Sequence, residues 1–139
     1  MKKISFLFAF FFAVALSAQS PIGIWKTIDD ESGEPKSHVE IYEKDGKIFG
    51  KVVKLLPKAT TDVCIDCPGD LNGKSLLEMD IIWDLEEYKD YWSYGHIIDP
   101  ANGKEYKLSI WLEDADTLKV RGYIGISALG RNQMWYRVK

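Results

Sequence analysis

Apolar and polar residues alternate in short segments along most of the chain after residue 20, and turn-forming residues separate these segments. In residues 37–43, for example, Val39 and Ile41 share one face, and residues 44–46 then supply a Lys-Asp-Gly hairpin signal. No window sustains a 3.6-residue period over the length of a helix, so the pattern predicts strands. The expected strands cover residues 23–28, 37–43, 48–55, 79–85, 91–98, 106–112, 118–124 and 132–138.

Eight short strands at nearly regular spacing predict an all-β fold. The turns between most of them are short, which favours an antiparallel up-and-down β-barrel over a Greek key. Eight strands is also the size at which a barrel encloses one small ligand, as in lipocalin-like or streptavidin-like barrels. A β-sandwich is the alternative. Residues 56–75 hold both cysteines and form a long loop in either case.

Three strands carry clear face assignments, and in residues 118–124 the stripe consists of Leu118, Val120, Gly122 and Ile124. Met79, Ile81, Trp83 and Leu85 are expected to share one face of their strand. Four further residues form a second stripe, opposite Trp111: Tyr106, Leu108, Ile110 and Leu112.

The first 18 residues have the pattern of a cleavable secretory signal. Lys2 and Lys3 precede 13 apolar or small residues, and Ser17 and Ala18 supply the small residues that a signal peptidase needs. The apolar run is shorter than the roughly 20 residues of a spanning helix. We therefore expect export to the periplasm or the medium, with residues 19–139 as a single barrel domain and no membrane span after cleavage.

Removal of this segment changes the composition. Without Lys2 and Lys3, 16 basic residues face 21 acidic ones, a net charge of −5. This balance argues against nucleic acid as a partner, because phosphates call for clustered Lys and Arg. Five Trp and seven Tyr remain but a single Phe. Trp and Tyr are favoured where an apolar surface meets water or a ligand.

Cys64 and Cys67 are the only cysteines, spaced Cys-x-x-Cys. A redox-active pair needs a thiolate at a helix N-terminus, and Pro68-Gly69 follows here instead. A zinc site would have to borrow His38 and His96, without a second paired motif. The third interpretation is a structural disulfide, which an oxidising compartment favours. No metal or other cofactor is expected.

Several segments resemble a secreted bacterial family called domain of unknown function 2147. They are Gly-Ile-Trp-Lys-Thr at 23–27, the cysteine motif at 64–68, residues 95–106, residues 118–125, Leu-Gly-Arg at 129–131 and Trp-Tyr-Arg-Val at 135–138. The resemblance covers nearly the whole chain after the signal. It implies export and a fold, and no reaction.

Gly23-x-Trp25 on the first strand also resembles, more loosely, the lipocalin and fatty-acid-binding barrels called calycins. That resemblance implies a Trp at the closed end of the barrel, with an Arg from the last strand lying across its ring. Arg137 is placed to take that role. A guanidinium over an indole contributes about 0.5–2 kcal/mol. An ordinary core tryptophan is the alternative.

The candidate ligand-binding residues are mostly aromatic and lie opposite the aliphatic stripes. Trp92, Tyr94 and His96 are expected to share a face, and Arg121 shares one with Tyr123. If the aliphatic stripes pack the core, these aromatics form an outer patch, and if the faces are inverted they line a cup; simple packing is the third possibility. The full set is Tyr42, Trp92, Tyr94, His96, Trp111, Arg121 and Tyr123.

The leading hypothesis is a non-enzymatic exported barrel that binds a small apolar or amphipathic molecule. The alternative is a cell-envelope interaction module that docks a protein or glycan through exposed aromatics. An enzyme of unknown reaction is a lesser alternative, because no catalytic motif stands out, and no catalytic residue is assigned. The sequence indicates no oligomeric state.

Overall fold

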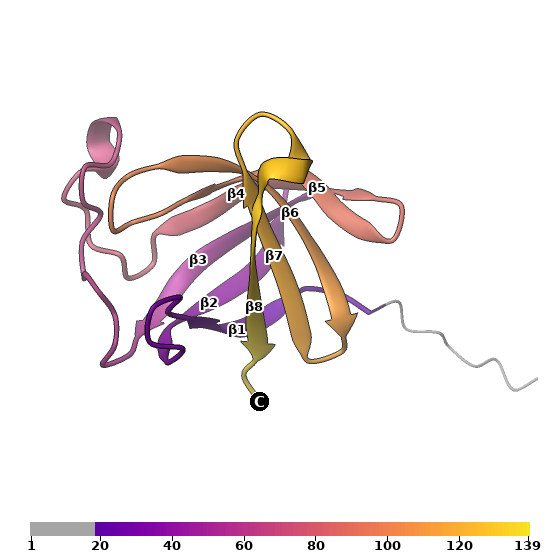
Figure 1. Ribbon diagram of the computed structural model, residues 1–139, viewed down its shortest axis with the longest axis horizontal. Helices are drawn as coiled ribbons and strands as arrows, with labels where there is room; N and C mark the ends of the chain where they lie inside the picture. Colours follow the sequence, from indigo (N-terminus) through magenta and orange to yellow (C-terminus); the bar gives the residue numbers. More distant parts are fainter. Residues whose placement is uncertain (1–18) are drawn as a thin grey trace, which may run out of the picture.

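The computed structural model describes residues 19–139, so the expected signal segment lies outside the described residues. Eight antiparallel strands form one closed barrel in chain order (Figure 1). They are β1 Gly23–Ile28, β2 Pro35–Lys44, β3 Lys47–Leu55, β4 Asp80–Tyr88, β5 Tyr91–Ile98, β6 Glu105–Asp114, β7 Thr117–Tyr123 and β8 Arg131–Arg137. The expected all-β, lipocalin-like barrel is confirmed, and the sandwich alternative is wrong.

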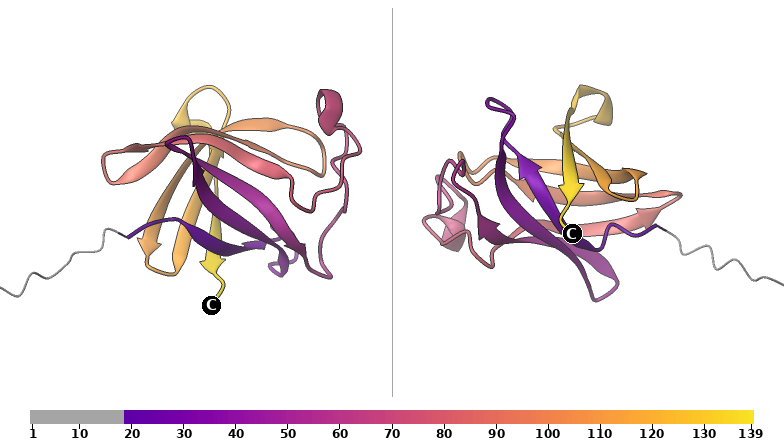
Figure 2. Two further views of the ribbon diagram at one scale, coloured as in Figure 1. Left: turned by 180° about the vertical axis from the view of Figure 1, so that it is seen from behind. Right: turned by 90° about the horizontal axis from the view of Figure 1, so that it is seen from below.

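Pairing between the first and last strands closes the barrel. Trp25 of β1 lies opposite Arg137 of β8, and Lys26 lies opposite Tyr136. The other seven pairings are between neighbours in the chain, as in a meander. Two single-turn 3-10 helices lie in the connections, η1 Gly69–Leu71 between β3 and β4 and η2 Ser127–Leu129 between β7 and β8. Figure 2 shows both standing away from the barrel wall.

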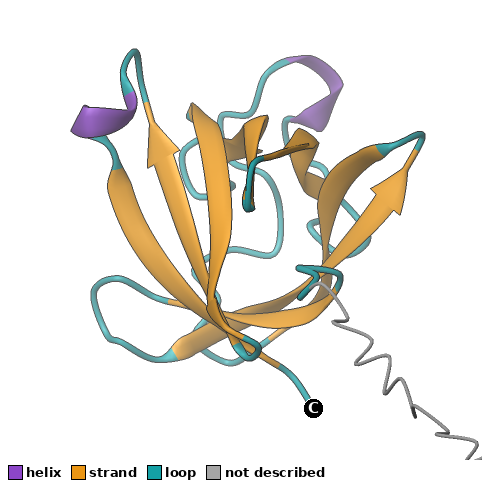
Figure 3. Cartoon of the chain, turned by 90° about the vertical axis from the view of Figure 1, so that its right-hand side faces the viewer, coloured by secondary structure: helices purple, strands orange, loops and turns teal. Residues whose placement is uncertain are grey.

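The barrel has two different ends because its connections alternate. The β1–β2, β3–β4, β5–β6 and β7–β8 connections gather at one end. Figure 3 shows the strands curving around the barrel, seen from the side of the β4–β5 turn. The tight turns β2–β3, β4–β5 and β6–β7 lie at the other end, together with the chain that enters β1. We call these the open end and the closed end. Among residues 19–139, no helix is long and apolar enough to cross a bilayer.

The core lies inside the barrel and follows the expected alternation on most strands. Side chains with no exposed surface include Trp25, Val39, Ile41, Leu85, Leu108, Ile110 and Leu118. This inner set consists mostly of the aliphatic stripes, so the stripes face inward and the positions between them face outward.

The expected face of residues 79–85 is wrong in part. The β3–β4 register shifts twice, so that Gly50 pairs with Ile82 and Lys51 with Asp80, and Asp84 has a positive φ of 61°. Ile82 and Leu85 are therefore both fully buried, although they are three residues apart. Trp83 instead stacks on His96, with ring centroids 5.6 Å apart. A bulge changes which face the following residues take.

Candidate functional site

The closed end is built around Trp25. Its indole is fully buried and donates a hydrogen bond from Nε1 to the carbonyl of Pro21 (2.8 Å). The guanidinium carbon of Arg137 lies 4.3 Å from the ring centroid, as the calycin resemblance implies. A Cβ on Gly23 would fall 2.6 Å from Arg137 Nη1, so a larger residue there would displace the guanidinium.

Arg137 also ties three chain segments together. It donates hydrogen bonds from Nε to Ala115 O (2.9 Å), from Nη1 to Ile22 O (3.0 Å) and from Nη2 to Ser20 O (3.0 Å). The Asp116 carboxylate lies 3.7 Å from Nε. One side chain thus joins the entering chain to the β6–β7 turn and covers the tryptophan.

The open end contains a cavity of about 460 Å³. Its wall is largely apolar, and residues from the connections at this end form its rim. Wall residues include Val52, Leu55, Ile97, Tyr106, Val120 and Trp135, and rim residues include Asp30, Thr61, Pro100, Ile124 and Leu129. Pockets of about 300–1,000 Å³ are typical of small-molecule sites.

Gly122 opens part of this space, because an added Cβ there would meet Tyr106 and Ile97 only at ordinary contact distances of 3.5 Å or more.

Polar groups in the cavity bond to one another. Thr27 Oγ1 and Ser37 Oγ lie 2.6 Å apart, both in nearly buried residues. On β8, Trp135 donates from Nε1 to Gln133 Oε1 (2.6 Å). Among the described residues, no buried side-chain nitrogen or oxygen lacks a partner. The deep part of the cavity therefore offers an apolar surface with few unused polar groups.

An ion pair at the mouth joins the β1–β2 connection to the start of β8. Arg131 Nη2 lies 3.0 Å from Asp30 Oδ2, and Gln133 Nε2 donates to Asp30 Oδ1 (3.0 Å). The Arg131 side chain is 83 % exposed, so water reaches this pair. The other charged residues that line the cavity are Lys36, at the start of β2, and Asp99, in the β5–β6 turn, so the charged lining comes from the open end of the barrel.

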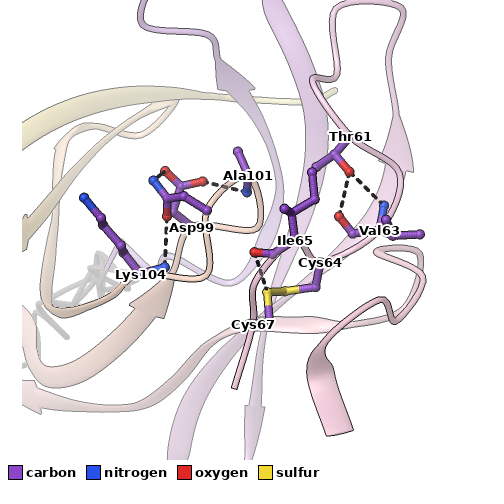
Figure 4. The surroundings of a disulfide bond; sticks show 9 residues. Thr61, Val63, Cys64, Ile65, Cys67, Asp99, Ala101 and Lys104 are labelled. Carbon is purple, nitrogen blue, oxygen red and sulfur yellow. Dashed lines mark hydrogen bonds between the residues drawn. A yellow bond between two sulfur atoms is a disulfide. The ribbon is translucent and has the colours of Figure 1, made fainter. Parts of the chain in front are cut away.

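The long β3–β4 connection forms one side of the mouth and contains a disulfide between Cys64 and Cys67. Both cysteines are buried. The loop docks on the β5–β6 turn, where Ile65 N donates to Pro100 O (2.8 Å). Figure 4 shows the disulfide and Ile65 beside the labelled residues Asp99 and Ala101 of that turn. A Cβ on Gly103 would collide with the backbone of Asp66, so these two turns pack backbone against backbone.

The β5–β6 turn is itself braced by Asp99. Its carboxylate accepts a hydrogen bond from Ala101 N (2.9 Å), and its own N donates to Lys104 O (2.8 Å) (Figure 4). The disulfide interpretation of Cys64 and Cys67 is supported, because the two sulfurs are bonded to each other. Among residues 19–139, no group of three His, Cys, Asp or Glu residues could hold a metal ion.

Of the seven candidate ligand-binding residues, the structure brings Tyr123 to the cavity. Trp92 lines a second hollow at the closed end, together with Leu112 and residues of the β4–β5 turn. The expected shared face of Trp92, Tyr94 and His96 is wrong. The β5–β6 register shifts between Trp92 and Gly95, and Tyr94 has a φ of 62°. Trp92 therefore pairs with inward-facing Ile110, and His96 pairs with exposed Lys107.

The outer wall carries an aromatic cluster that we call the outer aromatic patch, made of Tyr88, Tyr91, Tyr94 and Trp111. Tyr88 meets Tyr91 and Tyr94 edge to face at 5.4 and 5.6 Å, and Tyr91 meets Trp111 at 6.3 Å. Lys119 Nζ lies 5.3 Å from the centroid of the Trp111 ring. Lys119 also pairs with Glu113 at 2.8 Å, which keeps the pKa of that carboxyl below its ordinary value.

The three remaining candidates also have partners on the outer wall. His96 pairs with Glu105 (3.2 Å), and Arg121 donates to Asn132 Oδ1 (2.7 Å). Tyr42 stacks on Phe49 and donates a short hydrogen bond to Asp80. The pKa of Tyr42 is raised to about 12. Desolvation by burial is the largest cause, and the hydrogen bond to Asp80 is the second.

The residues that sequence reasoning missed are those of the inner wall. Tyr106 and Val120 belong to the expected stripes but were assigned to the core, and Gln133 and Trp135 were given no role. Strand alternation was the available signal, because it places Arg131, Gln133, Trp135 and Arg137 on one face of β8. Strand alternation does not, however, indicate whether the inner face is packed or surrounds a cavity.

The comparisons with known proteins agree with this geometry. At 20 % sequence identity, the chain resembles the solved structure of protein HP1028 from the human pathogen Helicobacter pylori, which is described as belonging to the lipocalin family. The TM-score is 0.75, and the match covers 86 % of this chain and 84 % of that one. This likeness concerns the fold. No curated relative matches the sequence. The family model of the uncharacterised proteins conserved in bacteria called DUF2147 matches residues 23–137, and the chain belongs to that family.

Proposed function

We propose that the protein is an exported binding protein that holds one small apolar or amphipathic molecule in the cavity at its open end. The observation that carries this is a largely apolar cavity of about 460 Å³, in which Thr27 bonds to Ser37 and Trp135 bonds to Gln133. When a ligand enters, water leaves the apolar surface of the ligand and that of the cavity wall, and no hydrogen bond within the protein is broken.

The distribution of charge gives the ligand an orientation. The apolar part lies deep, against Ile97, Val120 and Trp135. A polar head stays at the mouth, where Asp30 and Arg131 are solvated. The proposal therefore favours amphiphiles with one chain or ring system over molecules that are polar throughout. Export rests on the signal-like residues 1–18, and the N-terminus of the protein recovered from cell fractions, determined by mass spectrometry, tests it.

Filling the cavity tests the binding site. Gly122→Leu adds a side chain toward Tyr106 and Ile97 without a backbone clash. We expect the affinity for the fluorescent apolar probe N-phenyl-1-naphthylamine, and for palmitate that displaces it, to fall by about tenfold or more, because the leucine occupies ligand space. Fluorescence titration measures both affinities.

Lys107→Leu is the matched control, because it adds the same side chain at the exposed, outward position next to this site. It should leave the affinity unchanged. Wild-type protein that binds neither probe, or equal binding by Gly122→Leu, would show that the cavity is not the site.

The outer aromatic patch favours a second candidate function, docking of an envelope protein or glycan. Tyr94 in this patch is 58 % exposed. The same pair of variants separates the two candidates, since docking through the outer wall would be insensitive to a leucine inside the barrel.

A further inference from the structure

The connection between β7 and β8 carries an unusual concentration of exposed aliphatic side chains. Ile124, Ile126 and Leu129 are 68 %, 64 % and 76 % exposed. Residues 122–130 contain no charged side chain, and Arg121 and Arg131 flank them. We call residues 122–130 the rim segment. Exposed apolar groups of this size mark a surface that is covered in some state of the protein.

The position of two of these side chains indicates what covers them. Ile124 and Leu129 contribute to the cavity at the open end, although most of their surface lies in water. An apolar molecule that fills the cavity therefore ends beside them.

The rim segment is held at its base by close packing of the two strand ends. At the base, an added Cβ on Gly130 would fall 2.8 Å from Gly122 O and 3.1 Å from Arg121 Nε, so the two strand ends pack tightly. Beyond the base, Leu129 N donates a hydrogen bond to Ile126 O (3.1 Å). Glycines at 122, 125 and 130 leave the backbone few side-chain restraints. A glycine-containing segment with exposed apolar groups changes position at low cost.

We propose that the rim segment folds inward over the mouth when an apolar molecule is bound, and that Ile124 and Leu129 then become ligand-contacting residues. The inference rests on the proposed function, because it needs an occupied cavity. Closure removes aliphatic surface from water on the protein and on the ligand and desolvates no charge within the segment. Ile124 and Leu129 therefore slow the escape of the ligand, while entry takes place through the open form.

The test of movement places two spin labels across the mouth of the full chain, at Ile126→Cys and Thr60→Cys. Thr60 lines the opposite side of the cavity. Cys64 and Cys67 are bonded to each other, so labels attach to the new cysteines. Addition of N-phenyl-1-naphthylamine should shift the interspin distances measured by pulsed electron resonance to shorter values. Binding of the probe with an unchanged distance distribution would overturn the inference and leave the proposed function standing.

The test of contact is kinetic. Ile124→Ser combined with Leu129→Ser should accelerate dissociation of the probe by about tenfold and leave its association rate within about twofold. Leu77→Ser is the matched control, since Leu77 is 50 % exposed on the β3–β4 connection and does not line the cavity. Equal dissociation rates in all three proteins would contradict the role of Ile124 and Leu129.

Two further outcomes would separate closure over a ligand from absence of ligand binding and from contact with a membrane. Failure of the wild type to bind the probe would count against the proposed function, and the inference would fall with it. A label at position 126 that ignores the probe but becomes immobilised on phosphatidylcholine vesicles would show that the aliphatic groups serve a membrane surface, and the inference would be wrong.

Discussion

The two ends of the barrel use similar residues in opposite ways. At the closed end, Trp25 is fully buried, bonded through its nitrogen and covered by Arg137, which also holds three carbonyl groups. At the open end, Trp135 is equally buried, but it forms part of the wall of a cavity, and Arg131 extends into water. The first arrangement joins chain segments, and the second leaves space. Stability should therefore concentrate at the closed end, and binding at the open end.

The largest loss of stability is expected from a substitution at the centre of the closed end. Trp25→Ala should lower the free energy of unfolding by about 3–5 kcal/mol, because it leaves a large hole under Arg137. Leu129→Ala at the open end should change the same quantity by less than about 0.5 kcal/mol, since that side chain is 76 % exposed. Urea denaturation of the two variants measures both values. Similar losses at the two positions would remove the proposed division between the ends.

A smaller difference in the free energy of unfolding is expected between substitutions of Arg137 and Arg131. Arg137→Met keeps an apolar stem over the indole but loses three hydrogen bonds and the cation–π contact, so we expect a loss of about 2–3 kcal/mol. Arg131→Met removes an exposed ion pair and should cost at most about 1 kcal/mol. Denaturation curves in which Arg131→Met is the more damaging change would contradict this ranking.

The smallest effect concerns the disulfide at the open end. Cys64→Ser with Cys67→Ser should lower the free energy of unfolding by about 2 kcal/mol or less, because the bond closes a very short loop. Hydrogen exchange should accelerate in the β3–β4 connection, at amides such as Ile65 and Gly73, while the amides around Trp25 stay protected. Acceleration that spreads equally to the closed end would show that the disulfide supports the whole barrel.

Strand positions were predictable because alternation is a local property. All eight expected strands form, with ends within a few residues of the expected ones, and Gly23, Trp25 and Arg137 lie together at the closed end. Face assignment failed where a strand bulges. Asp84 and Tyr94 both adopt positive φ values, which non-glycine residues adopt infrequently, and sequence patterns gave no sign of them. Beyond each bulge the faces exchange, which moved Trp92 inward and left His96 outside.

The candidate site was predictable only in kind. An apolar ligand and a barrel were expected from the strand count and the calycin resemblance, but the seven candidate residues were chosen as aromatics opposite the aliphatic stripes. The structure places Tyr123 of that set at the cavity and leaves most of the others on the outer wall or at the closed end. The stripes themselves, with Tyr106 and Val120, form the cavity wall.

By itself, the sequence determined the strands and the meander between them, and the calycin resemblance added the tryptophan–arginine pair that closes the barrel. Each of these depends on neighbours in the chain or on one residue at either end. Only the tertiary structure decided that the inner face is filled at one end and hollow at the other. A period of two separates the two faces of a strand, but the space between strands far apart in sequence depends on closure, bulges and loop packing.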